Sequence, residues 1–241
     1  MTPTAALVDP IAFRAFVNAD ALADAVAQTF ARAVRTAVAA RGRASVVVTG
    51  GSTPRRYYPL MAALDLPWDK VTLTLSDERW VDADHPESNE RLLRELLLVG
   101  PAAAATLVPL KNDERTPTAG CAAAARALAA MPRPFDLVLL GLGADTHVAS
   151  LFPGASSFDE AVSTEAACVA VTPPAWIKPA LPRLSLSLKA LLDSRHIVLA
   201  ATGEDKHAAY LQARDGRWPQ PSPVPLLATR ARQPIDFFWT P

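Results

Sequence analysis

The sequence has only two cysteines, Cys121 and Cys168, among its 241 residues. They lie in unrelated segments and form neither a metal-ligand spacing nor a disulfide framework, so we expect both to pack as small apolar residues. Aromatic residues make up only 7% of the chain, and its 24 basic residues balance its 24 acidic ones. No basic stripe interleaved with aromatics is present, so nothing favours nucleic-acid binding. An anionic ligand would need local positive charge.

No apolar run approaches the ~20 residues of a transmembrane helix. The N-terminus lacks a basic region followed by an apolar stretch, so it does not resemble a signal peptide. None of the four histidines stands four residues from another or in a Cys/His cluster, which argues against a zinc site. We therefore expect a cytoplasmic protein that contacts no membrane and needs no metal or other cofactor.

Two common catalytic patterns are also missing. The G-x-S-x-G elbow of serine hydrolases does not occur in the chain. The dinucleotide-binding pattern G-x-G-x-x-G is absent too, because Gly141 and Gly143 continue into Ala144, Asp145 and Thr146. Neither covalent serine catalysis nor a dinucleotide or Walker-type nucleotide site is therefore supported.

The patterns that are present favour an α/β fold. Half of the residues are hydrophobic, and the chain is long enough to bury a sizeable core. Short β-prone runs alternate with helical patterns, which indicates a mostly parallel sheet with flanking helices in one domain over residues 1–241. We expect strands at 12–17, 45–49, 71–75, 106–110, 137–140, 167–172, 182–188, 196–202 and 235–239, and helices at 18–41, from 54, and at 88–99, 117–130, 189–193 and 204–213.

A first glycine loop, GGSTP at residues 50–54, follows the strand expected at 45–49. Pro54 suits the first turn of a helix, and Ser52 or Thr53 suits its N-cap. Backbone N–H groups and the helix dipole make such a start an anion site. An ordinary strand-to-helix turn explains the segment equally well, and the motif alone does not decide.

A second glycine loop follows the apolar run at 137–140, which is short and β-prone enough to be a buried central strand. Asp145 and His147 come directly after this loop. Ligands of open α/β sheets bind beyond the carboxyl ends of the strands. A histidine side chain titrates near neutral pH and can take a proton from water, and Asp145 could orient it.

Three cations stand at or near the ends of other expected strands: Arg79, Arg183 and Lys206. Each alone is an ordinary surface residue, but their common position favours a joint role in holding a substrate anion.

The chain resembles the 6-phosphogluconolactonases in five segments that follow the family's order: GGSTP at 50–54, SDERWV at 76–81 with ESN at 87–89, LGLGADTHVASLFPG at 140–154, Pro182-Arg183, and TGEDK at 202–206. The resemblance implies the Rossmann-like fold that this family shares with glucosamine-6-phosphate deaminases and ribose-5-phosphate isomerases. It implies metal-free hydrolysis of 6-phospho-D-glucono-1,5-lactone to 6-phosphogluconate in the oxidative pentose phosphate pathway.

The same resemblance implies the roles of individual residues. His147 would be the general base that activates water, with Asp145 as its catalytic partner. The substrate-binding residues would be Gly50, Gly51, Ser52, Thr53, Asp77, Arg79, Arg183 and Lys206. The expected partner is a small sugar-phosphate lactone, bound by a monomer or a homodimer.

Glucosamine-6-phosphate deaminases are the main alternative. Their usual pattern at this loop is D-G-H-x-A-F-N-E-P, in which the Glu assists sugar ring opening. Residues 146–153 of this chain contain no carboxylate. They also typically have D-E-Y where this chain has Asp77-Glu78-Arg79. Both differences favour the lactonase. A regulator that binds sugar phosphates without chemistry is a second alternative, but such a protein would most simply lose the histidine, and His147 is present.

One position departs from the family pattern. The lactonases usually have glycine between the Asp and the His, whereas this chain has Thr146. A β-branched residue at φ > 0 is a genuine outlier. We therefore expect the loop to have shifted so that Thr146 has φ < 0.

Overall fold

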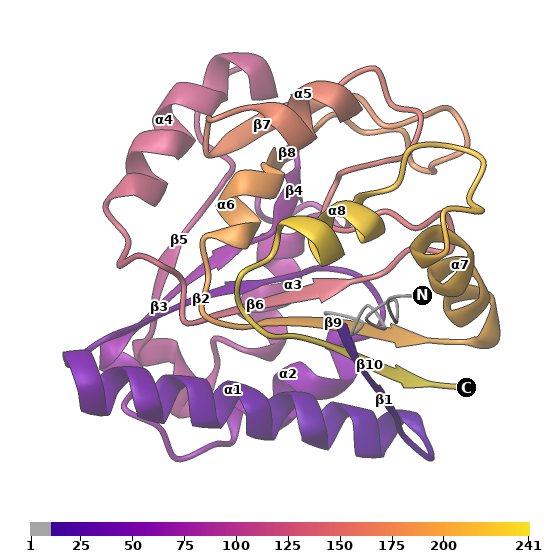
Figure 1. Ribbon diagram of the computed structural model, residues 1–241. Coiled ribbons are helices and arrows are strands. Elements are labelled where there is room, and N and C mark those ends of the chain that lie inside the picture. Colours follow the sequence, from indigo (N-terminus) through magenta and orange to yellow (C-terminus); the bar gives the residue numbers. More distant parts are fainter. Residues whose placement is uncertain (1–10) are drawn as a thin grey trace.

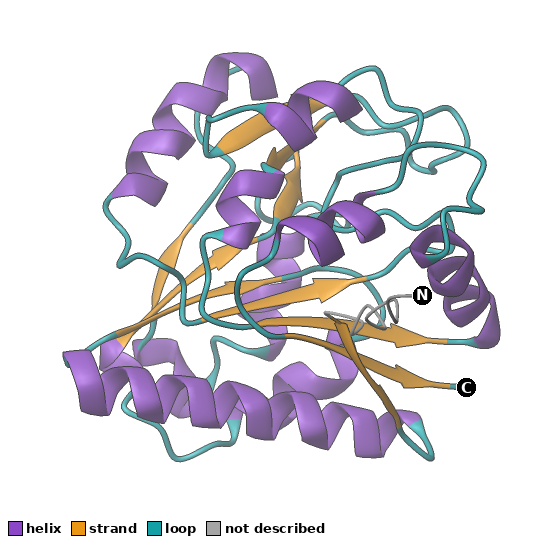
Figure 2. Ribbon diagram, in the orientation of Figure 1, coloured by secondary structure: helices purple, strands orange, loops and turns teal. Residues whose placement is uncertain are grey.

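The computed structural model describes residues 11–241, which form a seven-stranded sheet with helices on both faces (Figures 1 and 2). Its strands are β1 (Ile11–Ala15), β2 (Ala44–Val48), β3 (Val71–Leu75), β5 (Thr106–Val108), β6 (Leu137–Gly141), β9 (Ile197–Thr202) and β10 (Ile235–Thr240). Their order is β1-β10-β9-β6-β2-β3-β5, and every neighbouring pair is parallel. The predicted fold class is confirmed.

Strand β6 lies at the centre of this sheet, between β9 and β2. Its apolar residues 137–140 are at most 1% exposed, as expected for a parallel strand covered on both faces. The prediction of a buried central strand is confirmed. Because β2 and β6 are adjacent and parallel, the two glycine loops that follow them emerge at the same edge of the sheet.

Helix α1 (Ala19–Arg41) begins and ends where the sequence predicts. Asn18 caps it by accepting a hydrogen bond from the backbone N–H of Ala21 at 2.8 Å. Gly42 ends it in the left-handed conformation, with φ of 71°. The helix turns one apolar stripe toward the core: Leu22, Val26, Phe30 and Val34 are at most 1% exposed.

Seven further helices and two 3-10 turns complete the described chain. They are α2 (Pro54–Ala62), α3 (Asn89–Leu96), α4 (Pro117–Ala129), α5 (Phe158–Ser163), α6 (Leu188–Leu192), α7 (Glu204–Arg214) and α8 (Pro223–Arg230), with 3-10 turns at Trp68–Lys70 and Gly100–Ala104. In Figure 1, α1 and α2 lie below the sheet, and α6 and α8 lie above it.

Two of these helices are not predicted, and a third is shorter than predicted. Helix α8 falls in a proline-rich stretch, where Pro223 occupies a first-turn position that needs no N–H donor. Helix α5 is only six residues long and too short to show a helical period. Helix α3 ends at Leu96 rather than at 99.

A second, smaller sheet is also absent from the prediction. It joins β4 (Asp77–Arg79), β8 (Arg183–Leu186) and β7 (Cys168–Val171) in antiparallel order β4-β8-β7. The charged segment after β3 is not among the predicted strands, but it pairs with β8. The register places Arg79 directly opposite Arg183. Two predicted site cations are therefore neighbours across a strand pair.

The N-terminal prediction is only partly covered by the structure. The edge strand expected at 12–17 is present as β1, while residues 2–10 of the expected lead-in lie outside the described residues. One domain over residues 1–241 therefore stays a prediction. No helix within residues 11–241 is both long and apolar enough to cross a membrane.

Candidate active site

A cavity of about 180 Å³ opens where the segments after β2, β3, β6 and β9 meet. It is lined by every predicted site residue except Asp145, namely Gly50, Gly51, Ser52, Thr53, Asp77, Arg79, His147, Arg183 and Lys206. A larger cavity of about 550 Å³ between α5, α6 and α8 contains none of them. The predicted residues therefore converge on one small site, although they come from distant parts of the chain.

His147 and Asp145 form a pair at the edge of this cavity. Nδ1 of His147 hydrogen-bonds Oδ1 of Asp145, and the same oxygen accepts the backbone N–H of His147 at 3.3 Å. Burial disfavours the charged form of Asp145, but the hydrogen bonds from His147 outweigh it and hold the pKa of this carboxyl below its usual value. An ionised partner at Nδ1 leaves Nε2 as the nitrogen that can accept a proton.

Close packing fixes the orientation of this pair. A Cβ at Gly143 would lie 2.2 Å from Nδ1 of His147 and 2.5 Å from Oδ1 of Asp145, so only glycine fits there. The buried ring of Phe152 lies 4.5 Å from the imidazole, centroid to centroid. The guanidinium of Arg183 lies 5.1 Å from the centroid of the same ring. The imidazole of His147 and the guanidinium of Arg183 therefore pack on one aromatic side chain.

Arg79 and Arg183 carry donors that nothing in the described chain satisfies. The Nε atom of each is buried without a hydrogen-bond partner among residues 11–241. Lys206 adds a third cation, while Asp77 is the only carboxylate in the described lining. Buried donors are normally paired, and guanidinium groups bind phosphate and carboxylate strongly. This arrangement can bind an anion.

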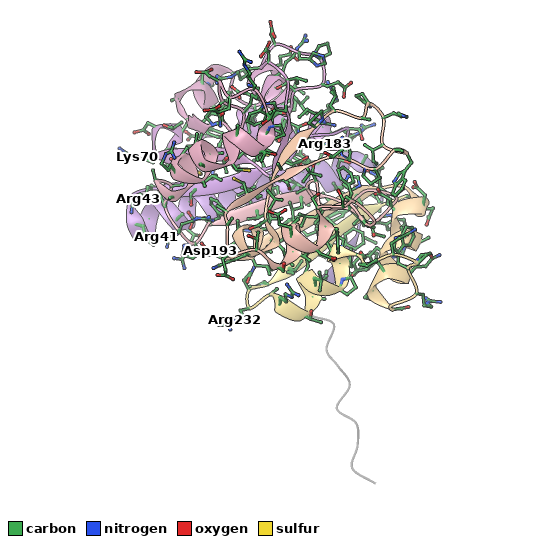
Figure 3. All side chains as sticks on the ribbon, turned by 90° about the horizontal axis from the view of Figure 1, so that it is seen from above. Arg41, Arg43, Lys70, Arg183, Asp193 and Arg232 are labelled. Carbon is green, nitrogen blue, oxygen red and sulfur yellow. The ribbon has the colours of Figure 1, made fainter. Side chains whose placement is uncertain are left out.

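Arg183 is unusual among the arginines because its side chain is only 7% exposed. Burial lowers its pKa, nearby Asp77 raises it, and Arg79 lowers it again. Figure 3 shows Arg183 within the outline of the chain, whereas Arg41, Arg43, Lys70 and Arg232 lie along its margin. A buried guanidinium beside a second one favours a bound anion, because the anion offsets their repulsion.

The carboxylate of Asp77 is used by the protein itself. Its oxygens accept hydrogen bonds from Ser76 at 2.9 Å and Ser150 at 2.6 Å, and Oδ2 lies 3.7 Å from Nη1 of Arg183. This geometry suits the positioning of Arg183. A direct contact between Asp77 and a substrate stays a prediction.

Asn89 lines the cavity although it is not among the predicted site residues. Its Oδ1 accepts a hydrogen bond from Arg79, and its Nδ2 donates to the carbonyl of Asp77 at 2.8 Å. A Cβ at Gly50 would lie 1.8 Å from Oδ1 of Asn89, so glycine is required for this approach. The ESN motif at residues 87–89 was the available signal.

Glu78 lies between Asp77 and Arg79 in β4 and is also not among the predicted site residues. It accepts the backbone N–H groups of Arg79, Asn89 and Glu90 at 2.7–2.8 Å and the Ser88 hydroxyl at 3.1 Å. These bonds tie β4 to the start of α3. Glu78 is thus occupied as a structural cap and does not line the cavity.

The start of α2 differs in detail from its prediction. Pro54 occupies the first turn as predicted, but Thr53 has helical dihedral angles and makes no capping hydrogen bond through its side chain. An N-cap residue normally has extended dihedral angles that direct its oxygen back to the helix. Thr53 is therefore the N-cap residue by position, as predicted, but it lacks the capping hydrogen bond, and both Ser52 and Thr53 line the cavity.

The sequence matches the family described as glucosamine-6-phosphate isomerases/6-phosphogluconolactonase over residues 17–239. The chain belongs to this family. It is 42% identical over 239 residues to a 6-phosphogluconolactonase of Caulobacter vibrioides, covering 95% of this chain and 97% of that protein. It is 41% identical to a 6-phosphogluconolactonase of Shewanella baltica OS155, whose crystal structure matches with a TM-score of 0.89 over 96% of this chain and 98% of that one. The predicted resemblance is confirmed.

The predicted fold relationship to the deaminases is confirmed as well. A monomeric glucosamine-6-phosphate deaminase is 16% identical and has a TM-score of 0.79, covering 95% of this chain and 97% of that chain. At this identity the match concerns the fold alone.

Within residues 11–241, no group of three or more His, Cys, Asp or Glu side chains is placed to hold a metal ion.

The backbone conformation of Thr146, where the family usually has glycine, differs from the prediction. Thr146 has φ of 70°, not the negative value expected from its β-branched side chain. The N–H of Thr146 donates to the carbonyl of Gly143 at 3.0 Å, and the N–H of Gly143 donates to the carbonyl of His147 at 2.9 Å. A three-residue loop closed in this way requires a left-handed residue after its turn. Closure of the loop therefore overrides the preference of threonine.

Replacing Thr146 with glycine is expected to raise Tm by roughly 2–6 °C. The change relieves a strain of about 1–3 kcal/mol, against about 0.5–1 kcal/mol of added unfolded-state entropy. It also removes a buried hydroxyl that has no partner among residues 11–241. Thr146→Val is the matched control, since it removes the hydroxyl but keeps the β-branch, and it should gain less. A glycine variant that melts no higher than wild type would contradict the strain.

Proposed function

We propose that this protein hydrolyses 6-phospho-D-glucono-1,5-lactone to 6-phosphogluconate in the oxidative pentose phosphate pathway. The observation that carries the proposal is the His147–Asp145 pair beside a cavity lined by three cations and one engaged carboxylate. A lactone is an activated acyl centre, so its hydrolysis needs a base for water and stabilisation of charge. The relatives from Caulobacter vibrioides and Rhizobium meliloti, 42% and 36% identical over nearly full length, are 6-phosphogluconolactonases.

In the proposed complex the 6-phosphate lies against the backbone of residues 50–53 at the start of α2. Unpaired N–H groups of a first helical turn and the positive end of the helix dipole both favour a phosphate. Arg79, Arg183 and Lys206 supply the positive charge from β4, β8 and α7. The Nε atoms of Arg79 and Arg183 are buried and have no partner among residues 11–241, which supports this placement for the two arginines.

In the proposed reaction Nε2 of His147 takes a proton from a water molecule that attacks C1 of the lactone. The developing oxyanion is stabilised by nearby backbone N–H groups or a cation. His147 then returns its proton to the ring oxygen as the C1–O bond breaks. Asp145 stays ionised, because its pKa is depressed, and stabilises the imidazolium formed in between.

The reaction class can be tested with purified protein treated with a chelator. We expect hydrolysis of 6-phosphogluconolactone well above its spontaneous rate, measured by acid release at constant pH, and no ammonia from glucosamine 6-phosphate. The segment after His147 carries no carboxylate that could assist ring opening. Ammonia release, or activity that the chelator abolishes and zinc restores, would contradict the proposal. Binding without turnover would identify a regulator instead.

A cytoplasmic location and a monomeric or homodimeric state stay predictions.

A further inference from the structure

The two cysteines, which are distant in sequence, meet at the contact between α4 and β7. Sγ of Cys168 lies 3.4 Å from the carbonyl oxygen of Cys121, 47 residues away, and donates to it. Both cysteines are free of disulfide bonds. Figure 1 shows α4 beside β7 at the top of the molecule. The fold therefore builds a dithiol that the sequence does not suggest.

The two thiols have unequal surroundings. Cys168 is only 4% exposed, as predicted for a core residue, whereas Cys121 is only partly buried. The pKa of Cys121 is lowered to about 7: the neighbouring Cys168 side chain lowers it, burial raises it, the backbone of Ala170 lowers it and Glu160 raises it. The neighbouring Cys121 side chain and burial raise the pKa of Cys168. Cys121 is therefore the more accessible of the two thiols and the one that loses its proton more readily.

We propose that Cys121 and Cys168 form a peroxide-reactive pair, in which Cys121 attacks and Cys168 resolves. Sγ of Cys121 attacks one oxygen of a hydroperoxide, the O–O bond breaks, and an alcohol or water leaves while Cys121 becomes a sulfenic acid. The thiol of Cys168 then attacks the sulfenic sulfur. A disulfide forms, and water leaves with the proton of that thiol. An accessible thiolate next to a resolving thiol is the arrangement that redox-sensitive cysteines share.

This pair is separate from the cavity of about 180 Å³ in which we propose that the lactone binds, called the lactone cavity below, whose lining includes neither cysteine. It is nevertheless connected to the site through the small sheet. Cys168 pairs with Leu186 in β8, and Val171 pairs with Arg183 at the other end of the same ladder. The disulfide would covalently link α4 to the sheet that carries Arg79 and Arg183.

The first test treats the reduced full-length protein with hydrogen peroxide at neutral pH and follows its intact mass. We expect loss of two hydrogen atoms and a peptide cross-linked through Cys121 and Cys168. In Cys168→Ser, a sulfenic acid should accumulate at Cys121 and be trapped by dimedone. In Cys121→Ser, Cys168 should stay unmodified. Oxidation of Cys168 before Cys121, or disulfides formed only between molecules, would overturn the proposal.

A second test uses two variants of Cys168 that differ only in the donor. Serine keeps a hydroxyl that can hydrogen-bond the Cys121 thiolate, whereas alanine removes it. At pH 7 we expect alkylation of Cys121 by iodoacetamide to slow by about 5–10-fold in Cys168→Ala, toward the behaviour of an ordinary thiol, and by less than about 2-fold in Cys168→Ser. Circular dichroism establishes that each variant is folded. Equal alkylation rates in the two variants would show that Cys168 does not activate Cys121. Alkylation of Cys168 before Cys121 in the wild-type protein would also overturn the proposal.

Discussion

Replacing His147 with alanine is expected to lower kcat for lactone hydrolysis by about 10²–10⁴-fold, the usual contribution of general acid–base catalysis. KM should change much less, because the residues proposed to bind the phosphate are other residues of the cavity. The expectation rests on the Nδ1 contact with Asp145 and on the packing of the imidazole against Phe152, which hold the ring in one orientation. Initial rates over a range of lactone concentrations give the two constants separately.

The chain offers a matched control for this variant. His196 also pairs with a carboxylate, Oδ2 of Asp236 at 2.9 Å, but it lines a different cavity with Asp136 and Arg195. His196→Ala should leave kcat within about two-fold of wild type. Asp145→Asn keeps the size of the partner and removes its charge, so kcat should fall by at least about ten-fold. A His147→Ala protein that retains most of its kcat would remove this residue from the mechanism.

Replacing Arg183 with alanine is expected to raise KM by about 10–100-fold, with a smaller loss in kcat. A hydrogen bond to a charged group contributes about 1.5–3 kcal/mol, and each 1.4 kcal/mol is about ten-fold in affinity. We expect the effect of Arg183→Ala to lie at the upper end of this range, because the Arg183 side chain is buried and its Nε has no partner within residues 11–241. Some loss in kcat follows because binding energy at the phosphate also positions the lactone.

Two further variants separate phosphate binding from stability. Arg183→Ala leaves Asp77 buried without its cation, so the assay must be run well below the measured Tm. Arg183→Lys keeps the charge but loses the planar fork, and its KM should fall between those of wild type and alanine. Arg195→Ala removes a guanidinium whose carboxylate partner is Asp136, outside the lactone cavity, and should leave KM unchanged. If Arg183→Ala discriminates phosphorylated from unphosphorylated lactone as well as wild type does, Arg183 does not bind the phosphate.

Features that depend on neighbouring residues were predictable from the sequence. The run at 137–140 is apolar throughout, which indicates a strand buried on both faces, and β6 is the central strand. Asn18 and Gly42 mark the ends of α1 because capping involves residues only a few positions apart. The two glycine loops were predicted from glycines that directly follow β-prone runs, which is also a local pattern. The site residues were identified through their motifs, and the structure brings all but Asp145 into the cavity lining.

Features that depend on contacts between distant segments required the tertiary structure. Strand β4 is three residues long and pairs with β8, more than 100 residues later, so no period in either segment reveals that Arg79 faces Arg183. The Cys121–Cys168 pair has the same origin, because α4 and β7 meet only in the folded chain. At Thr146 local preference predicts the wrong sign of φ, since the closed loop that presents His147 requires a left-handed residue. The sequence by itself thus determined the fold class and the chemical groups of the site, whereas long-range strand pairing and loop closure determined how those groups face one another.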